Sequence, residues 1–335
     1  MGATSSALLA YYKGGDSLMQ LPPRGGLKPQ AVWLLVVFLS SPRLASAWGQ
    51  QGHKIVNAAA VENLPEPLRS YFRSRKAFLV DHAVDPDRLA KENAAELRHH
   101  YTEVESYDSY PFETFRRQFV GERRPPNPLQ ISHGDSLWQI ERFTFLLADA
   151  MRRRRWDQAD LAAVFAAHYA CDLTQPLHTI VNYDGQLTNQ TGLHSRFETG
   201  LVRALSAQWI LKPQPPVQDA DLRARIFVEY LESYRHSQLI FAGDRLAVFG
   251  RNYHDPEFFR AFDNILGLLA RKRLEAAVSF VSSLWYTAWI RAERPQLGGR
   301  PLETGSNSYF TDESGVIRWT SEDRPATAKD PPFGG

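Results

Sequence analysis

Two pairs of metal-ligating side chains dominate the middle of the sequence. His168 and Asp172 stand four residues apart, as do His194 and Glu198, and His178 lies between the pairs. Residues four apart share one face of a helix, so each pair can hold a cation with two ligand atoms. A lone His-x3-Asp is more often a surface pair or a hydrogen-bonded core histidine. Two such pairs and an intervening histidine within 31 residues predict a metal centre.

A second group of candidate ligands lies upstream, in an acid- and histidine-rich segment over residues 81–108. Asp85 and His100 are the candidates there, and His99 competes with His100 for the same role. Taken alone, each of them is explained as well by a solvated, capped loop. Their assignment therefore depends on the rest of the pattern.

The amino-terminal region has the pattern of a secretory signal peptide. The apolar run over residues 31–39 is about half the length that crosses a bilayer. Arg24 and Lys28 precede it, and the small residues Ala45-Ser46-Ala47 follow, which is the order typical of a cleaved signal. We expect cleavage after Ala47 and a secreted or periplasmic protein; an unprocessed anchor is the alternative. The true start is either Met1 or Met19.

Cleavage at that point would give the mature chain a metal-binding terminus. Its first residues are Trp48-Gly49-Gln50-Gln51-Gly52-His53. A free α-amine has a pKa of about 8, low enough to lose its proton to a metal, and the carbonyl oxygen of the same residue can close a five-membered chelate. The amine and carbonyl of Trp48, with the His53 ring, would present three ligand atoms in six residues.

The composition of the chain and the motifs it lacks exclude several classes of protein. The chain has 335 residues, and 39 Lys and Arg against 37 Asp and Glu give a formal net charge of +2. The overall charge therefore does not attract a polyanionic partner, which must be bound by a local group of residues. The single cysteine, Cys171, excludes a disulfide framework and Cys-based zinc modules, and is expected to be a small packed residue. The sequence has no Gly-x-Ser-x-Gly or His-Glu-x-x-His, which excludes serine hydrolases of that type and zincin proteases.

The segments that carry these residues favour helix. Apolar residues recur every three or four positions over 134–155, 160–172 (with Asp160 as the candidate N-cap) and 274–295. Helix is also favoured over 195–210, 218–248 and 256–270, and no segment alternates over strand length. We therefore predict an all-α fold with a signal peptide and upstream extension over residues 1–47, a single multi-helix domain over 48–295, and a disordered tail over 296–335.

In this order and spacing, the ligands resemble those of the trinuclear-zinc superfamily that joins bacterial phospholipase C to the single-strand-specific nucleases of the S-one/P-one type. The resemblance covers the chain from Trp48 to about residue 295 and implies an all-α domain of that type with three Zn²⁺ ions. It implies a first zinc held by Asp85, His100, His168 and Asp172, a second held by His178, His194 and Glu198, and a third held by Trp48, His53 and Asp172.

The resemblance is divided between the two branches of that superfamily. The Trp-Gly-x-x-Gly-His start and the 15-residue step from Asp85 to His100 resemble the nucleases. The 16-residue step from His178 to His194, and Glu198 in place of the usual Asp, resemble the phospholipases. The resemblance therefore leaves both substrate classes open.

The expected chemistry is hydrolysis of a phosphodiester. Bound zinc lowers the pKa of water to about 7, so we expect a metal-bound hydroxide to attack phosphorus in line. Asp85 is the candidate to orient or deprotonate that water, although its role as a ligand would by itself explain it. The resemblance implies that Tyr101 stacks a nucleobase and that Glu103 reads a base edge. A packed tyrosine and a surface glutamate are the alternatives for the last two.

These observations predict an exported zinc-dependent hydrolase. Single-stranded nucleic acid and 3'-nucleotides are the leading substrates, with no obligate protein partner implied. Phospholipase C activity on phosphatidylcholine-like lipids is the alternative. A zinc-binding protein without catalytic activity is the third possibility.

Overall fold

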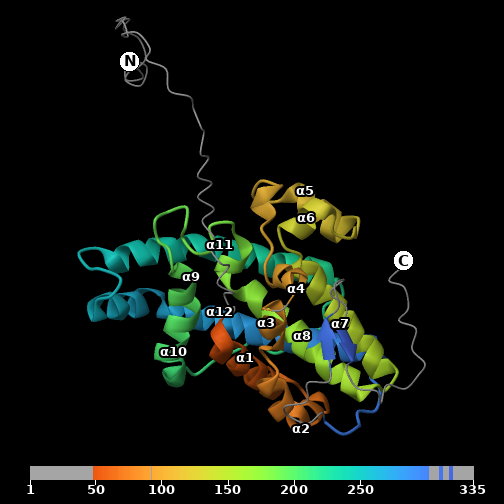
Figure 1. Cartoon of the computed structure of the whole chain (residues 1–335). Coiled ribbons are helices and arrows are strands. Elements are labelled where there is room, and N and C mark those ends of the chain that lie inside the picture. Colours follow the sequence, from red (N-terminus) through yellow and green to blue (C-terminus); the bar gives the residue numbers. More distant parts are fainter. Residues whose placement is uncertain (1–47, 92, 302–308, 312–316, 320–335) are drawn as a thin grey trace, which may run out of the picture. The chain divides into compact units, whose positions relative to one another are not determined.

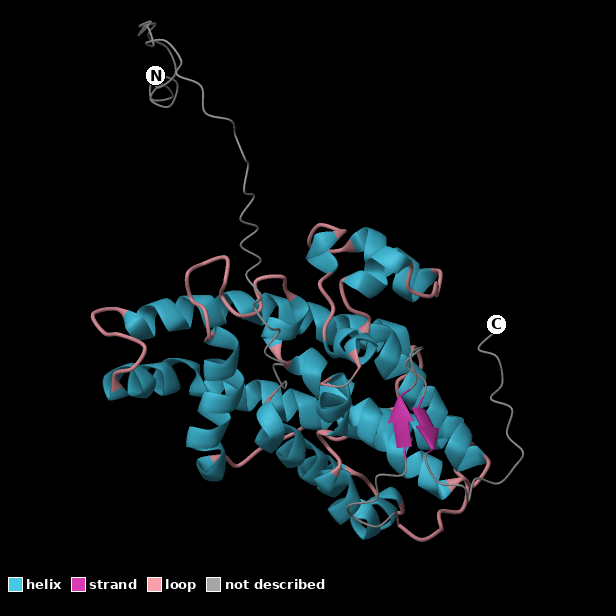
Figure 2. Cartoon of the chain, in the orientation of Figure 1, coloured by secondary structure: helices cyan, strands magenta, loops and turns pink. Residues whose placement is uncertain are grey.

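The computed structural model describes residues 48–91, 93–301, 309–311 and 317–319 (Figure 1). The predicted signal peptide and extension over residues 1–47, and with them the choice between Met1 and Met19, lie outside the described residues. Helices make up nearly all the regular structure of the described part (Figure 2), which confirms the prediction of an all-α fold. None of the described helices is long and apolar enough to span a membrane.

Six long helices form the body of the molecule: α1 (Gly49–Asn63), α2 (Leu68–Asp81), α7 (Ser136–Arg152), α8 (Trp156–Thr174), α11 (Leu222–Val248) and α12 (Pro256–Arg291). Shorter α-helices connect them: α3 (Asp85–Ala90), α4 (Ala94–Leu97), α5 (Glu113–Arg116), α6 (Pro128–Ser132), α9 (Leu193–Ser195) and α10 (Leu201–Leu205). The remaining turns are 3-10 or π-helical: η1 (Arg98–His100), η2 (Val104–Ser106), η3 (Arg117–Gly121), η4 (Pro176–Thr179), η5 (Arg196–Gly200) and η6 (Ser206–Gln208).

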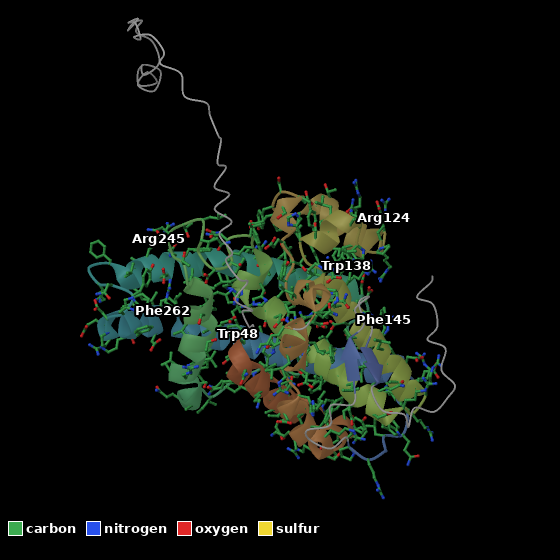
Figure 3. The ribbon with its side chains drawn as sticks, in the orientation of Figure 1. Trp48, Arg124, Trp138, Phe145, Arg245 and Phe262 are labelled. Atoms are coloured by element: carbon green, nitrogen blue, oxygen red, sulfur yellow. The ribbon has the colours of Figure 1, made fainter. Side chains whose placement is uncertain are left out.

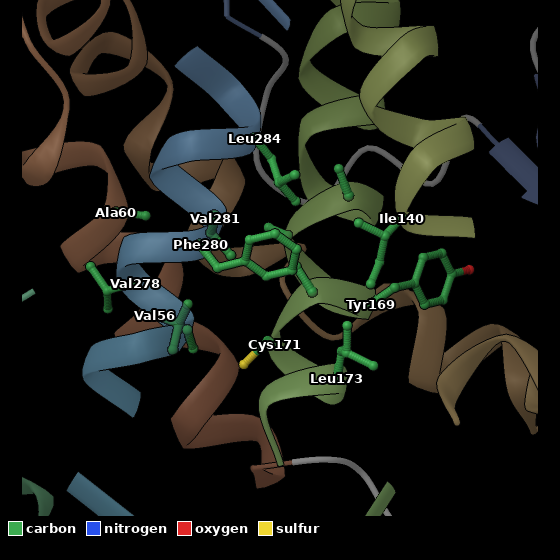
Figure 4. Close-up of a cluster of buried hydrophobic side chains, with 14 of the residues drawn as sticks. Val56, Ala60, Ile140, Tyr169, Cys171, Leu173, Val278, Phe280, Val281 and Leu284 are labelled. Carbon is green, nitrogen blue, oxygen red and sulfur yellow. The ribbon is translucent and has the colours of Figure 1, made fainter. Parts of the chain in front are cut away.

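The core lies where α1, α7, α8 and α12 pack together. Their facing sides carry aliphatic residues at helical spacing, which the sequence pattern predicts for α7, α8 and α12 but not for α1. Figure 4 shows this cluster, which includes Val56 and Ala60 of α1, Ile140 of α7, Cys171 and Leu173 of α8, and Val278, Val281 and Leu284 of α12. Cys171 is free and buried here, as expected for a small packed residue.

Two helix boundaries differ from the prediction. Helix α8 begins at Trp156, so Asp160 lies inside it and is not the N-cap. The Asp160 carboxylate is fully buried and accepts a hydrogen bond from Arg75 Nε at 2.8 Å, which makes an interior position acceptable for this charge. Helix α12 runs unbroken for 36 residues and joins two segments that the sequence presents separately.

The segment predicted as a tail begins with contacts to the body. Leu297 packs against the core, and Arg75 Nη2 donates hydrogen bonds to the carbonyl oxygens of Gly298 (2.7 Å) and Gly299 (3.1 Å). Further on, β1 (Tyr309–Thr311) pairs antiparallel with β2 (Ile317–Trp319). Residues 302–308, 312–316 and 320–335 of the predicted tail lie outside the described residues.

Candidate metal centre

Three buried groups of His and carboxylate side chains lie in the part of the chain that the structure describes, and within each group one ligand atom per residue lies within 4.8 Å of the others. We name them cluster A (Asp87, His100, His168), cluster B (His53, His168, Asp172) and cluster C (His178, His194, Glu198). They bring together side chains from α1, α3, η1, α8, η4, α9 and η5. Seven of the nine predicted metal ligands belong to these clusters; Trp48 and Asp85 do not.

The side chains of cluster A meet at one face of α8. His168 Nε2 lies 3.1 Å from His100 Nδ1, and Asp172 Oδ2 lies 2.9 Å from His100 Nδ1 and 3.4 Å from His168 Nε2. Asp87 Oδ1 approaches the same two nitrogens, at 3.7 Å and 3.6 Å. Four potential ligand atoms therefore converge at this point, and Asp172 takes part although it belongs to cluster B.

These spacings fit a tetrahedral metal. Ligand atoms at about 2.0–2.1 Å from a tetrahedral zinc lie roughly 3.3 Å from one another, and the five distances in cluster A range from 2.9 to 3.7 Å. The His168 ring supports the same interpretation. Its Nδ1 donates to the Ala83 carbonyl oxygen at 2.8 Å, so the neutral ring directs the lone pair of Nε2 into the cluster.

The structure corrects one predicted ligand, since Asp87 occupies the place expected for Asp85. Asp85 Oδ2 lies 2.5 Å from His82 Nδ1, and Asp85 Oδ1 accepts a hydrogen bond from Arg88 at 2.7 Å. Both aspartates are in α3, where side chains two residues apart point about 200° apart around the helix axis. Only one of them can face His100, and that residue is Asp87.

The competition between the neighbouring histidines is resolved in favour of His100. The His99 ring points to α7, where its Nδ1 lies 2.6 Å from Asp135 Oδ1. Asp135 also accepts from Gln139 at 3.0 Å, so this pair belongs to the contact between η1 and α7. His100 belongs to cluster A, where its Nδ1 contacts Asp172 and His168.

Cluster B shares both residues of the α8 pair. His53 Nε2 of α1 lies 3.3 Å from Asp172 Oδ1, and the His53 ring stacks on the His168 ring with centroids 4.1 Å apart. His53 Nε2 and Asp172 Oδ1 are both buried and have no hydrogen-bond partner among the described residues. Leaving two such atoms unpaired is costly, so they fit a site for a cation. Asp172 thus directs one oxygen to cluster A and the other to cluster B.

Trp48 lies between the elements that carry clusters B and C (Figure 3). Its indole is fully buried, donates from Nε1 to Thr174 Oγ1 at 3.4 Å and contacts the Phe197 ring with centroids 5.7 Å apart. Trp48 has a left-handed backbone conformation (φ 53°), and a Cβ at position 52 would stand only 2.5 Å from Trp48 Cβ. Gly52 therefore permits this tight first turn of α1, as the Gly-rich start of the sequence suggests.

Cluster C is built on the second predicted pair. His194 Nε2 lies 2.7 Å from Glu198 Oε2 and 3.0 Å from His178 Nε2. The third distance, from His178 to Glu198, is 3.8 Å. The chain over 195–210 is helical as far as Gln208, as predicted, but a π-helical turn, η5, interrupts the α-helix and carries Glu198. Such turns often occur at functional sites, and the i, i+4 contact is still made.

A hydrogen bond joins cluster C to cluster A. His178 Nδ1 donates to the His100 carbonyl oxygen at 2.7 Å, which directs Nε2 into cluster C and ties η4 to η1. Gln175, which the sequence pattern did not single out, also belongs to this site. Its Nε2 lies 3.2 Å from both His194 Nε2 and Glu198 Oε2, and its side chain is fully buried.

The buried carboxylates set the charge of the centre. Burial alone raises the pKa of Asp172, but hydrogen bonds from His100 and His53 and the charge of His100 hold it well below its usual value. Burial, with the charges of His53 and His100, lowers the pKa of His168, although Asp172 opposes this. The centre therefore holds a stable anion beside an imidazole that stays neutral, which is the protonation state that metal ligation requires.

The two predicted substrate-binding residues lie beside cluster C. Thr102, between them, donates from its backbone nitrogen to the His178 carbonyl oxygen at 3.0 Å, so this stretch runs next to η4. Tyr101 is half-buried, and its pKa is raised to about 12 by burial and by the charge of Glu103. Glu103 is mostly buried and pairs with His133 Nδ1 at 3.2 Å, so it is not a surface glutamate.

A second tyrosine faces the same region. Tyr183 is 39% exposed, and its ring stands edge-on to His194 with centroids 5.9 Å apart. It also lies near enough to Glu103 and Tyr101 for its charge to raise the pKa of Tyr101. No pattern in the sequence indicated Tyr183, because its position depends on the loop between η4 and α9.

Comparison of the chain with protein-family models and with curated proteins gives no match. The functional assignment therefore depends on the geometry of the three clusters.

We predict that zinc binding near neutral pH releases protons. Burial alone lowers the pKa of His100, but the hydrogen bond to Asp172 and the charges of Asp172, Asp87 and Glu96 raise it to about 9. Below that pH the metal-free ring holds a proton that must leave when the metal binds, so zinc affinity should rise between about pH 7 and pH 9. Calorimetric titration in two buffers with different ionisation enthalpies measures the protons released. Equal heats in both buffers would contradict the prediction.

Proposed function

We propose that this chain is an exported three-zinc phosphodiester hydrolase that acts on single-stranded nucleic acid and 3'-nucleotides. The observation that carries the proposal is the division of the Asp172 carboxylate between two clusters, with cluster C joined to cluster A through His178. Several ions at one centre suit a phosphodiester, because one can activate water while the others stabilise the charged phosphoryl oxygens. A single structural metal would not need this arrangement.

The residues of the chain have distinct tasks in this proposal. His53, Asp87, His100, His168 and Asp172 would hold two ions, and His178, His194 and Glu198 would hold the third. When bound, zinc lowers the pKa of water to about 7 and acts as a Lewis acid on the phosphoryl group. Asp85 is not assigned to the metals in this proposal, because its two oxygens contact His82 and Arg88.

The proposal includes removal of residues 1–47. Cleavage after Ala47 would free the α-amine of Trp48. The Trp48 indole contacts Thr174, two residues after Asp172, and Phe197, the residue before Glu198. The amine and carbonyl of Trp48 would then complete cluster B, which otherwise has few ligands. Intact-mass measurement of the exported protein tests this step, since a mature chain that starts at any other residue contradicts it.

Tyr101 and Glu103 provide the support for a nucleotide substrate. An aromatic ring and a buried carboxylate next to cluster C could stack a base and accept hydrogen bonds from its edge. His133 holds one oxygen of Glu103, which leaves the other free to orient towards a ligand. Tyr183 adds a second ring on the same side.

We predict that Tyr101→Ala weakens nucleotide binding and leaves the metals in place. Base stacking contributes roughly 1–3 kcal/mol, so KM for a 3'-nucleotide should rise about fivefold or more while zinc content stays at the wild-type value. Steady-state kinetics and metal analysis of the same sample measure both. Tyr110→Ala, at an exposed tyrosine that packs on Tyr234, is the matched control and should leave KM unchanged. An unchanged KM for Tyr101→Ala would assign this residue to packing.

One observation favours phospholipid as a second candidate substrate. Large apolar side chains are exposed around the turn between α11 and α12, including Leu246 (65%), Phe249 (83%) and Phe259 (44%). Exposed Phe and Leu are the residues that insert into the boundary of a lipid surface. A phospholipase C would use such a surface to reach its substrate.

The experiment that separates these functions uses purified, zinc-loaded protein and three substrates. Cleavage of single-stranded DNA supports the proposal. Release of phosphocholine from lecithin vesicles with DNA left intact would assign the protein to phospholipase C. Binding of zinc without hydrolysis of either substrate or of a generic bis-phosphodiester would make it a zinc-binding protein that lacks catalysis.

A further inference from the structure

Glu96 is a buried carboxylate that the proposed chemistry does not use. It lies in α4, its side chain is fully buried, and its Oε2 has no hydrogen-bond partner among the described residues. Its Oε1 accepts a short hydrogen bond from the Tyr169 hydroxyl. Burying a carboxylate is costly unless it is paired, so a second partner for Glu96 is expected.

The nearest candidate is the outer nitrogen of His100. His100 Nε2 lies 3.8 Å from Glu96 Oε1, and it also has no hydrogen-bond partner in the described part of the chain. Glu96 and His100 are four residues apart on the run of α4 and η1, so their side chains share one face. A buried ring nitrogen without a partner therefore faces the Glu96 carboxylate, whose Oε1 accepts from Tyr169 and whose Oε2 still needs a partner.

Two other metal-facing histidines show what such a nitrogen can do in this protein. His168 and His178 each donate from the ring nitrogen that points away from their cluster to a backbone carbonyl oxygen, at 2.8 and 2.7 Å. This outer hydrogen bond fixes which nitrogen faces the metal. The Nδ1 atom of His100 lies in cluster A. Its Nε2 atom faces the Glu96 carboxylate instead of a backbone carbonyl oxygen.

Tyr169 fixes the position of that carboxylate. Its side chain is fully buried on α8, next in sequence to His168, and its ring stands edge-on to His100 with centroids 5.6 Å apart. The helix that carries the His168–Asp172 pair thus also holds Glu96 at a set distance from the His100 ring.

We propose that Glu96, held by Tyr169, is a positioning residue that accepts a hydrogen bond from His100 Nε2 and so orients Nδ1 towards the metal of cluster A. The inference rests on the proposed function only in that cluster A binds a metal; it does not depend on the substrate. A carboxylate at this position also makes the imidazole more basic and a stronger ligand. Loss of such a partner typically lowers metal affinity about 10- to 100-fold.

The test compares zinc retention in Glu96→Gln, Tyr169→Phe and wild type, each purified as the mature protein. Samples are dialysed against increasing chelator concentrations, and the zinc that remains is counted. We expect Glu96→Gln to lose one of its zinc ions at about 10- to 100-fold lower chelator concentration than wild type, and Tyr169→Phe to shift in the same direction by less. Glu141→Gln is the matched control, since Glu141 is a buried carboxylate paired with Arg223 on the α7 and α11 helices.

Thermal unfolding of the metal-free variants separates positioning from a merely structural role. If Glu96→Gln and Tyr169→Phe unfold at lower temperature but retain zinc as wild type does, the inference is overturned. Should Glu96→Gln fail to fold, Tyr169→Phe, which keeps the ring and loses only the hydroxyl, decides the outcome by its own zinc retention. Wild-type protein that binds no zinc would overturn the proposed metal centre itself, which is a different result.

Discussion

Asp172→Asn is expected to abolish metal binding at two of the three clusters. Asp172 Oδ2 lies 2.9 Å from His100 Nδ1 in cluster A, and Oδ1 lies 3.3 Å from His53 Nε2 in cluster B. An asparagine carries no negative charge for either cluster, and one of its two terminal atoms becomes an NH2 group that cannot ligate a cation. Zinc content should fall from three ions to about one, and hydrolysis of a bis-phosphodiester should fall by about 100-fold or more.

Metal analysis and kinetics on the same preparation check this result. Asp160→Asn is the matched control, because Asp160 is equally buried on the same helix but pairs with Arg75 instead of a metal cluster. Loss of the Asp160 charge should lower the unfolding temperature and leave the zinc content unchanged. Full zinc occupancy in Asp172→Asn would show that this carboxylate does not bridge two ions.

The contacts that residue spacing alone predicted correctly are those set by the geometry of one helix or one turn. The resemblance, and not the spacing, placed His53 and His100 beside Asp172. His168 and Asp172 are four residues apart on α8, so helix periodicity alone brings their ligand atoms within 3.4 Å. The same argument places His194 beside Glu198, although a π-helical turn replaces the regular helix there. The all-α fold follows for the same reason, because apolar spacing reports the helix face that must be buried.

Contacts between distant elements could not be predicted in this way. Glu96 and Tyr169 are 73 residues apart in the sequence, and nothing in either local pattern indicates that they meet. Gln175 follows α8 as its C-cap and looks like an ordinary polar cap until η5 brings Glu198 to 3.2 Å from it. Such partners become visible only when the packing of α4, α8 and η5 is known.

The choice between Asp85 and Asp87 shows the limit within a single short element. Both residues lie in α3, and the sequence between positions 81 and 93 contains too few apolar residues to reveal which side of this helix is buried. The 15-residue step to His100 favoured Asp85, whereas the helix directs Asp87 to the cluster. A two-residue shift is enough to change the ligand, because the direction of a side chain depends on the helical phase and not on the count of residues.

This difference leads to a prediction with a built-in control. Asp87→Asn should lower zinc affinity at cluster A by about 100-fold or more, because it removes an oxygen that lies 3.7 Å from His100 Nδ1 and 3.6 Å from His168 Nε2. Asp85→Asn makes the same chemical change two residues away in the same helix, at a side chain that is also buried. It should keep three zinc ions and lower the unfolding temperature, since His82 and Arg88 lose the charge that they contact.

Zinc counting after dialysis, with activity on a bis-phosphodiester, distinguishes the two carboxylates. Loss of one zinc in Asp87→Asn alone supports the cluster as the structure has it. Loss in Asp85→Asn alone would mean that the helix turns the other way in the metal-bound protein and that the spacing argument is correct. Because the two variants differ in position and not in chemistry, a general effect of removing a buried charge should appear equally in both, and only metal ligation can separate them.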